Sequence, residues 1–166
     1  MSSEVTNINE RKVVLPTWLD TLIFNDLSAN YCRQNKDMVV LEWNFDDIKK
    51  YLGTYFPRSY AESFCIFSNF FSKEKYVYEN CQELSIFDFS CGTGGELIGF
   101  IMAVTTQLPN IKKISIRALD GNPYALRCLE CILENTSKVL CIDIESKVIP
   151  IVIDDFYDMD IVTNVM

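Results

Sequence analysis

The sequence IFDFSCGTGGE at residues 86–96 constrains the fold of this chain more than any other stretch. An apolar run reaches an acidic residue, a turn of small residues follows, and an amphipathic helical pattern begins. This order predicts a buried strand, a tight loop and a helix. Because glycine has no Cβ and tolerates unusual dihedral angles, such a loop lets a ligand approach the backbone. The free N–H groups at the start of the helix would point toward that ligand.

In the second half of the chain, short apolar runs alternate with helical patterns. Strands are expected at residues 85–89, 111–119, 148–153 and 160–165. Helices are expected at residues 96–107 and, after the capping residue Asn122, at 123–138. Strands that alternate with helices of this length predict parallel β-α-β units with right-handed crossovers.

The first half of the chain is predicted to be helical. One helix is expected at residues 16–27, with Pro16 in its first turn. A second begins after Asn44, with Gly53 as the candidate breaker near its end. A third begins at residues 59–62, where SYAE fits a capping box, and an aromatic stripe packs it.

The predicted fold class is therefore α/β, a parallel sheet with flanking helices that is preceded by a helical N-terminal lead. Residues 1–83 form the lead or lid in this prediction, and residues 84–166 form a core with the first four strands.

Composition excludes several classes of protein. The chain has 166 residues, enough for one domain with a real core, and a net charge of −8, which disfavours non-specific binding to nucleic acid. It has no histidine, so a Ser-His-Asp or Cys-His catalytic site is excluded. No apolar run is long enough to span a membrane, and the polar N-terminus lacks a signal core. We therefore expect a cytoplasmic protein with no membrane partner.

The seven cysteines are expected to be reduced and mostly buried, because no secretion signal is present. Cys128 and Cys131 form a C-x-x-C pattern. No second pair lies at zinc-like spacing, so this pattern is interpreted as two small apolar residues on a helix, and no metal site is predicted.

Acidic residues follow three of the predicted strands. Asp88 ends the first strand, Asp120 ends the second, and Asp154 and Asp155 follow the third. In an open parallel sheet, ligands bind at the carboxyl ends of the strands. A carboxylate after the second strand can accept both hydroxyl protons of a ribose, and one after the third can accept from an adenine amine. Together these acids predict a nucleoside site.

A dinucleotide is the least favoured ligand. Its fingerprint, G-x-G-x-x-G, lacks the third glycine here, because Gly92 and Gly94 are followed by Gly95, Glu96 and Leu97. Glu96 also puts an acid in the first helical turn, where the phosphates would lie. An NAD-linked oxidoreductase is therefore the last-ranked function.

The loop resembles the first motif, D-x-G-x-G-x-G, of the Rossmann-fold (class I) S-adenosylmethionine-dependent methyltransferases. Here it reads DFSCGTG at residues 88–94, with Ser90 in place of the first glycine. The sequences DGNP at 120–123, IDDF at 153–156 and DIVTN at 160–164 are similar to the second, third and fourth motifs of that family. The resemblance covers about residues 84–166, and it implies a Rossmann-like sheet that binds S-adenosyl-L-methionine.

The resemblance also implies roles for individual residues. Ser90, Cys91 and Gly92, in the loop that continues to Gly94, would line the methionine part of the cofactor, and Asp88 would contact its amino group. Asp120 would hold the ribose hydroxyls and Asp155 the adenine. In the helical lead, Arg58 would pair with the cofactor carboxylate, and Tyr55 or Tyr60 would cover the methyl end. Asn164 is the candidate for contact with the methyl acceptor.

Members of this family usually have three strands beyond the fourth, whereas this sequence ends at Met166. The sequence is accordingly expected to be the N-terminal part of a larger methyltransferase or a shortened relative. Because an open sheet edge promotes aggregation, we expect a second copy or a partner chain to cover it.

Two functions stay open at this point. The first is a methyltransferase, or its cofactor-binding part, that transfers a methyl group directly to an unidentified acceptor. The alternative is a non-catalytic, methyltransferase-like binding or interaction module, which the missing first glycine and the short sheet favour.

Overall fold

A computed structural model describes residues 13–33 and 44–151 as an α/β protein. The predicted class is confirmed, including the parallel sheet, the flanking helices and the helical N-terminal region. The helices are α1 (Thr17–Thr21), the π-helix η1 (Leu22–Asp26), α2 (Phe45–Glu74), the 3-10 helix η2 (Lys75–Tyr78), α3 (Gly95–Gln107) and α4 (Pro123–Leu140). The strands are β1 (Glu83–Phe89), β2 (Lys113–Asp120) and β3 (Asp143–Pro150).

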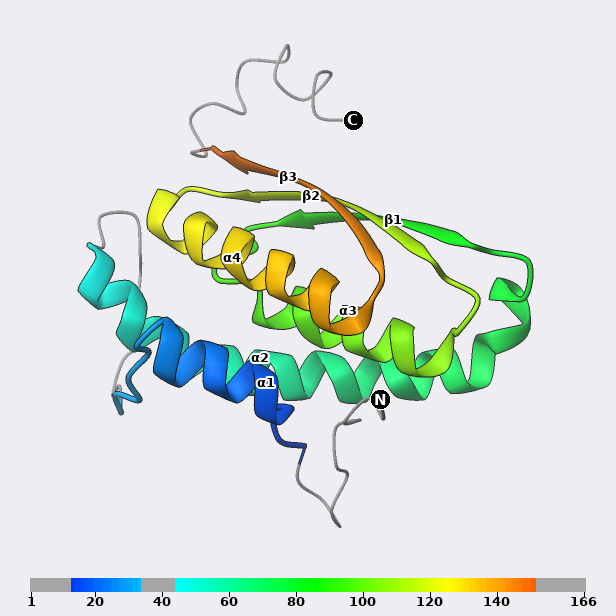
Figure 1. The fold of residues 1–166 in the computed structure, drawn as a ribbon, viewed down its shortest axis with the longest axis horizontal. Helices are drawn as coiled ribbons and strands as arrows, with labels where there is room; N and C mark the ends of the chain where they lie inside the picture. Colours follow the sequence, from blue (N-terminus) through cyan, green and yellow to red (C-terminus); the bar gives the residue numbers. More distant parts are fainter. Residues whose placement is uncertain (1–12, 34–43, 152–166) are drawn as a thin grey trace.

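The described sheet is open, with the strand order β1-β2-β3 and parallel pairing throughout. Helices α3 and α4 both lie on one face of it (Figure 1). Right-handed crossovers explain this, because strands added in one direction place each connecting helix on the same face. Along β2, Ile116 and Ala118 point to the helices and are buried, whereas Arg117 between them is exposed. The strand alternation therefore separates a covered face from an open one.

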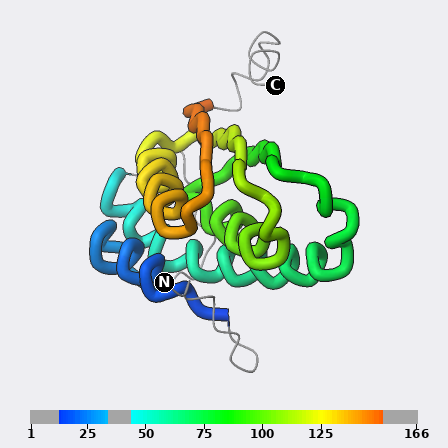
Figure 2. The backbone as a smooth tube through the Cα atoms, turned by 45° about the vertical axis from the view of Figure 1, so that its right-hand side comes forward, coloured from blue at the N-terminus to red at the C-terminus, as the bar shows by residue number. Residues whose placement is uncertain are grey.

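The N-terminal helices form a third layer. Figures 1 and 2 show the sheet, then α3 with α4, then α2 with α1. One hydrophobic core cluster joins these layers, from Leu19 and Leu52 through Ile101 to Ile116 and Ile132. The helical lead and the sheet therefore share a core across the boundary predicted at residue 84.

Helix α2 is one continuous helix of 30 residues, where the sequence predicted two. The predicted cap is present, since Asn44 Oδ1 accepts from the N–H groups of Asp46 and Asp47 at 2.9 and 3.1 Å. The predicted break at Gly53 and the predicted start at Ser59 are wrong. Every fourth residue from 48 to 64 is buried, and this unbroken stripe packs both halves of α2. Leu52, Phe56, Tyr60 and Phe64 lie in the main core cluster, and Ile48 packs in a smaller cluster with residues of α4.

Gly53 lets the backbone of Asn30 approach this helix closely. A Cβ there would lie 2.5 Å from the carbonyl carbon of Asn30, in the segment that crosses α2. Asn30 N–H donates to the Lys49 carbonyl at 3.0 Å, which fixes that crossing. Pro57 lacks the N–H that would bond the Gly53 carbonyl, so one hydrogen bond of α2 is missing. The helix continues through this position because its tertiary packing outweighs the loss of that bond.

Strand β3 begins five residues before the predicted start at 148. Its first half is polar and exposed on the open face, so it lacks the apolar run that marked the other strands. Pairing with β2 defines this half, with Asp143 beside Lys113 and Glu145 beside Ser115. The predicted residues 152–153 and the predicted fourth strand at 160–165 lie outside the described residues.

Candidate functional site

The loop from β1 to α3 takes left-handed backbone angles at alternate positions. Ser90, Gly92 and Gly94 have φ values of 63°, 52° and 83°. These are the three positions where the methyltransferase motif has spaced glycines. Ser90 adopts the same conformation with a side chain, which costs roughly 1–2 kcal/mol relative to glycine. The loop therefore takes left-handed angles at all three alternate positions, including the one that carries a side chain.

Two backbone hydrogen bonds fix the loop against the sheet. Cys91 N–H donates to the Leu119 carbonyl at 3.0 Å, and Gly94 N–H donates to the Cys91 carbonyl at 2.9 Å. The first bond joins the loop to the end of β2, so the carboxyl ends of β1 and β2 form one rigid edge. Helix α3 begins directly after this turn, with Gly94 as its cap residue.

Asp120 ties the two strand ends together. Its Oδ2 accepts from the Gly92 N–H at 2.8 Å, and its Oδ1 accepts from the Asn122 N–H at 2.8 Å. An ionised carboxylate has about four acceptor positions, so each oxygen keeps capacity for one more donor. Asp120 is thus both a structural brace of the loop and a possible acceptor for ligand hydroxyls.

A narrow cleft of about 70 Å³ lies between α2 and the loop. The aromatic rings of Tyr51 and Tyr55 lie in contact at its α2 side, 5.0 Å between centroids. Within residues 13–33 and 44–151, no lysine or arginine lines the cleft; the lining residues are Tyr51, Tyr55, Phe56, Ser59, Asp88, Ser90, Cys91, Thr93, Gly94, Gly95 and Glu96. The cleft is therefore acidic and aromatic, and large enough only for a small polar group.

The acidic side chains of the site perturb one another. Burial, followed by the charges of Glu96 and Asp120, raises the pKa of Asp88 from 3.8 to about 6. No hydrogen-bond or ion-pair partner of the Asp88 carboxylate is found among residues 13–33 and 44–151. A half-buried carboxylate beside two other acids favours a cationic ligand.

Two other groups of the site are held neutral. Burial, together with the charge of Asp120, raises the pKa of the Tyr51 hydroxyl. Burial and the charge of Asp88 raise the pKa of the Cys91 thiol well above its usual range. Cys91 is therefore a thiol at neutral pH, and thiolate nucleophilic chemistry is not favoured at this position.

The predicted residues of α2 divide into two groups. Tyr55 lines the cleft, whereas Tyr60 is fully buried and stacks on Phe64. Arg58 is exposed and pairs with Glu62 at 3.0 Å, and Ser59 is the cleft-lining residue of this turn. The structure thus brings Asp88, the loop and Asp120 together but does not place Arg58 among the residues that line the cleft. Asp155 and Asn164 lie outside the described residues.

Sequence reasoning missed a close contact between α2 and α3 that positions the cleft. A Cβ at Gly95 would lie 2.9 Å from the Phe56 carbonyl oxygen, and one at Gly99 would clash with the Tyr60 carbonyl oxygen. Ser63 Oγ donates to the Glu96 carbonyl at 2.7 Å in the same contact. The available signal was the spacing of small residues, Gly95 with Gly99 on α3 and Ser59 with Ser63 on α2.

Tyr51 was also missed, because it lies far from the motif in the sequence. Its hydroxyl oxygen would be 3.3 Å from a Cβ at Gly92, so α2 places it directly over the loop. No local pattern marks Tyr51 as a site residue, and only the packing of α2 on α3 brings it there.

Comparisons with known proteins do not identify a family. No protein-family model matches the chain, and no curated protein is similar enough to count as a match. In residues 13–33 and 44–151, no helix is both long enough and apolar enough to cross a membrane. The same residues contain no cluster of three or more histidine, cysteine or acidic side chains suited to a metal ion.

Proposed function

We propose that this chain binds S-adenosyl-L-methionine at the carboxyl ends of β1 and β2, as a methyltransferase or the cofactor-binding part of one. The observation that carries the proposal is the backbone of the loop, with left-handed angles at Ser90, Gly92 and Gly94 between a parallel strand and a helix. The acid at the end of the next strand, Asp120, supports the proposal because it contacts the loop directly.

The donors and acceptors at the site fit the chemistry of this cofactor. Asp88 offers an unpaired carboxylate to an ammonium group, and Asp120 offers spare acceptor capacity to ribose hydroxyls. Gly92 and Gly94 carry no side chains of their own, although Tyr51 lies over Gly92 and Leu129 lies beside Gly94. The cleft holds only a small polar group, so the nucleoside would lie outside it.

When bound, the cofactor supplies a methyl group that its sulfonium already activates, so a protein contributes mainly orientation and electrostatics. In this chain Asp120 and the loop would orient the ligand. Asp88 and Glu96 would supply negative potential, and Tyr51 with Tyr55 would exclude water from the α2 side. Asp155 and Asn164 keep their predicted roles toward adenine and the unidentified acceptor.

Titration calorimetry with S-adenosylmethionine and S-adenosylhomocysteine tests the proposal. Asp120→Ala should weaken binding by at least about tenfold, equivalent to about 1.4 kcal/mol. Asp143→Ala is the matched control, since it removes an exposed aspartate at the opposite, amino end of β3. Circular dichroism of each variant separates loss of binding from loss of fold.

Absence of binding by both ligands at millimolar concentration would contradict the proposal. Binding of NAD in preference to both would favour the dinucleotide alternative instead.

A non-catalytic binding module is the second candidate. The specific observation in its favour is that Asp120 already accepts two backbone N–H groups, so the acid stabilises the loop without a ligand. Transfer of a labelled methyl group to protein, RNA or small-molecule fractions of a cell extract distinguishes the two. Binding with no transfer to any fraction would favour the module.

A further inference from the structure

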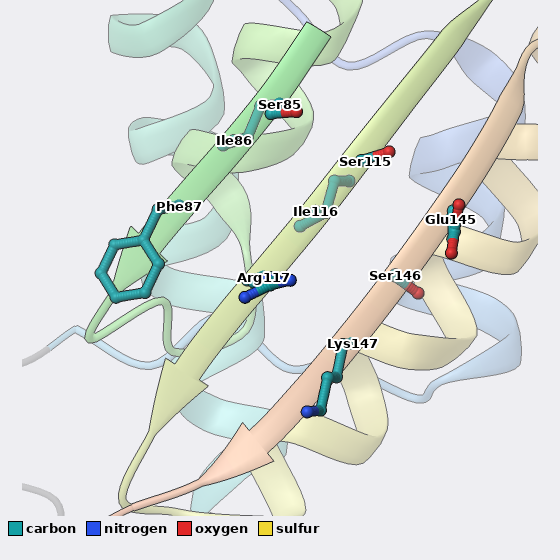
Figure 3. Close-up of a pocket in the computed structure, with 9 residues that line it drawn as sticks. All are labelled: Ser85, Ile86, Phe87, Ser115, Ile116, Arg117, Glu145, Ser146 and Lys147. Atoms are coloured by element: carbon teal, nitrogen blue, oxygen red, sulfur yellow. The ribbon is translucent and has the colours of Figure 1, made fainter. Parts of the chain in front are cut away.

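The two edges of the described sheet differ in character. The middle of β3 carries Glu145, Ser146 and Lys147, all exposed, and charged side chains are a known protection of sheet edges against pairing. The middle of β1 carries Ile86 and Phe87, and Phe87 is 55% exposed. Figure 3 shows both edges, with Phe87 on one side and the polar residues of β3 on the other.

A groove of about 380 Å³ runs beside β1, between this strand and helices α2 and α3. Its volume lies within the range of ligand-binding clefts. The walls are largely apolar, with Ile66, Phe67, Ile86, Phe87, Leu97 and Phe100 among the lining residues. Ile66 is 63% exposed although it faces this groove from the middle of α2. An exposed apolar edge beside an apolar groove indicates a surface for another segment.

The groove has an acidic end. Glu62, Asp88 and Glu96 line it, and no lysine or arginine is among the lining residues that the structure describes. Glu62 already pairs with Arg58, whereas Asp88 and Glu96 have no ion pair within the described ranges. An occupant with a basic residue near Asp88 would complement this charge.

The charge also selects between possible occupants. Residues 152–166 of this chain contain four aspartates and no lysine or arginine, so they do not complement an acidic groove. A partner segment with a basic residue complements it better.

We propose that the edge of β1 binds an extended, apolar segment of a partner polypeptide as an additional strand, with a basic residue of that segment beside Asp88. Main-chain hydrogen bonds to β1 supply affinity in this mode, and the groove selects alternate apolar side chains. The inference does not depend on methyl transfer, but it shares Asp88 with the proposed cofactor site, so the basic residue of the segment and the cofactor ammonium would compete for that carboxylate.

The test measures binding of a fluorescein-labelled peptide, Lys-Thr-Ile-Thr-Val-Thr-Val, to the full chain by fluorescence anisotropy. We expect saturable binding that Ile66→Asp weakens by at least about tenfold, because a carboxylate would enter the apolar wall. Val139→Asp is the matched control, since Val139 is a similarly exposed apolar residue on α4 outside the groove. A peptide with glutamate in place of lysine should bind more weakly.

Four outcomes would overturn the proposal. One is no saturable binding up to millimolar peptide, and a second is equal loss with Val139→Asp. A third is tighter binding of a synthetic peptide of residues 152–166, which would make this chain its own occupant. The fourth is a concentration-dependent dimer that Ile66→Asp dissolves, which would assign the edge to a second copy. Cofactor binding is measured separately, so failure here leaves the proposed function unaffected.

Discussion

The glycines of the loop and the glycines of helix α3 lie within eight residues of one another but serve different physical needs. Gly92 and Gly94 adopt positive φ angles that side chains disfavour. Gly95 and Gly99 have helical geometry, and there the absence of a Cβ lets the backbone of α2 approach. The loop glycines thus shape the candidate ligand site, whereas the helix glycines position α2, which supplies its second wall.

The comparison teaches that a single glycine-rich stretch can encode a turn and an interface in succession. Ala103 continues the spacing of Gly95 and Gly99 on α3 and is fully buried. A stripe of small residues therefore extends from the loop into the helix contact. Substitutions along it should separate backbone strain from close packing.

The largest effect is expected for Gly99→Ala. Alanine in place of glycine inside a helix normally stabilises by about 1 kcal/mol. Here the added methyl would meet the backbone carbonyl of Tyr60, which cannot move without shifting α2, so we expect destabilisation of about 3 kcal/mol. Urea unfolding measures it, with Thr106→Ala on the exposed side of α3 as the control. A more stable Gly99→Ala variant would break the distinction between the two glycine pairs.

Gly94→Ala should have the next largest effect, about 2 kcal/mol. The φ angle of 83° is strained for alanine, and the methyl would also meet the Leu129 side chain. Because that contact is the end of a flexible side chain, Leu129 can move aside. The double variant Gly94→Ala with Leu129→Val shows whether strain or crowding dominates: recovery of most of the stability would assign the cost to crowding and contradict our emphasis on the backbone angle.

Asp88→Asn should change how the stability of the protein depends on pH. The raised pKa of Asp88 means that the folded protein favours the protonated form, so its stability is highest below about pH 4 and falls as pH rises through about 6. Asparagine removes this loss. Relative to wild type, we expect the variant to gain about 1–2 kcal/mol at pH 7.5, a value reduced for the partial exposure of Asp88, and nothing at pH 4.

Thermal unfolding of wild type and Asp88→Asn at several pH values between 4 and 8 measures that gain. A difference that does not change with pH would show that Asp88 does not titrate in this range. Under the proposed function, the same variant should also bind S-adenosylmethionine more weakly, because it loses the carboxylate that faces the ammonium group.

Ser90→Gly should have the smallest effect and the opposite sign. Glycine relieves the left-handed strain at φ 63° but adds entropy to the unfolded chain, which leaves a net stabilisation of about 0.5–1 kcal/mol. Cofactor affinity should change little, because the loop already follows the path that glycine would take. A loss of stability would show that the Ser90 side chain makes a contact that outweighs its strain.

Local signals in the sequence predicted much of the fold. The caps at Asn44 and Asn122 are present as expected, because a side chain two or three residues from its N–H partner needs no distant element. The strand, loop and helix around residues 83–107 were located for the same reason. The proximity of Asp88 and Asp120 was also predictable, since parallel strands align their carboxyl ends.

Where distant packing outweighs a local signal, prediction failed. Gly53, Pro57 and the capping pattern at Ser59 all favour a helix end, yet α2 continues through them. Burial of the apolar stripe from Ile48 to Phe64 contributes more stabilising free energy than a single missing hydrogen bond or an unfavourable glycine costs. Similarly, the polar first half of β3 becomes a strand only because it pairs with β2.

By itself, the sequence determined the α/β class, the glycine loop and the acids that face it, because hydrophobic periodicity and backbone angles are properties of neighbouring residues. Only the tertiary structure decided that α2 is one helix, that Tyr51 lies over Gly92 and that Asp120 bonds the loop. Each of these depends on contacts between segments that are distant in the sequence, as in the bond between Gly92 and Asp120, 28 residues apart. Their geometry is set when the layers pack, and no local pattern contains it.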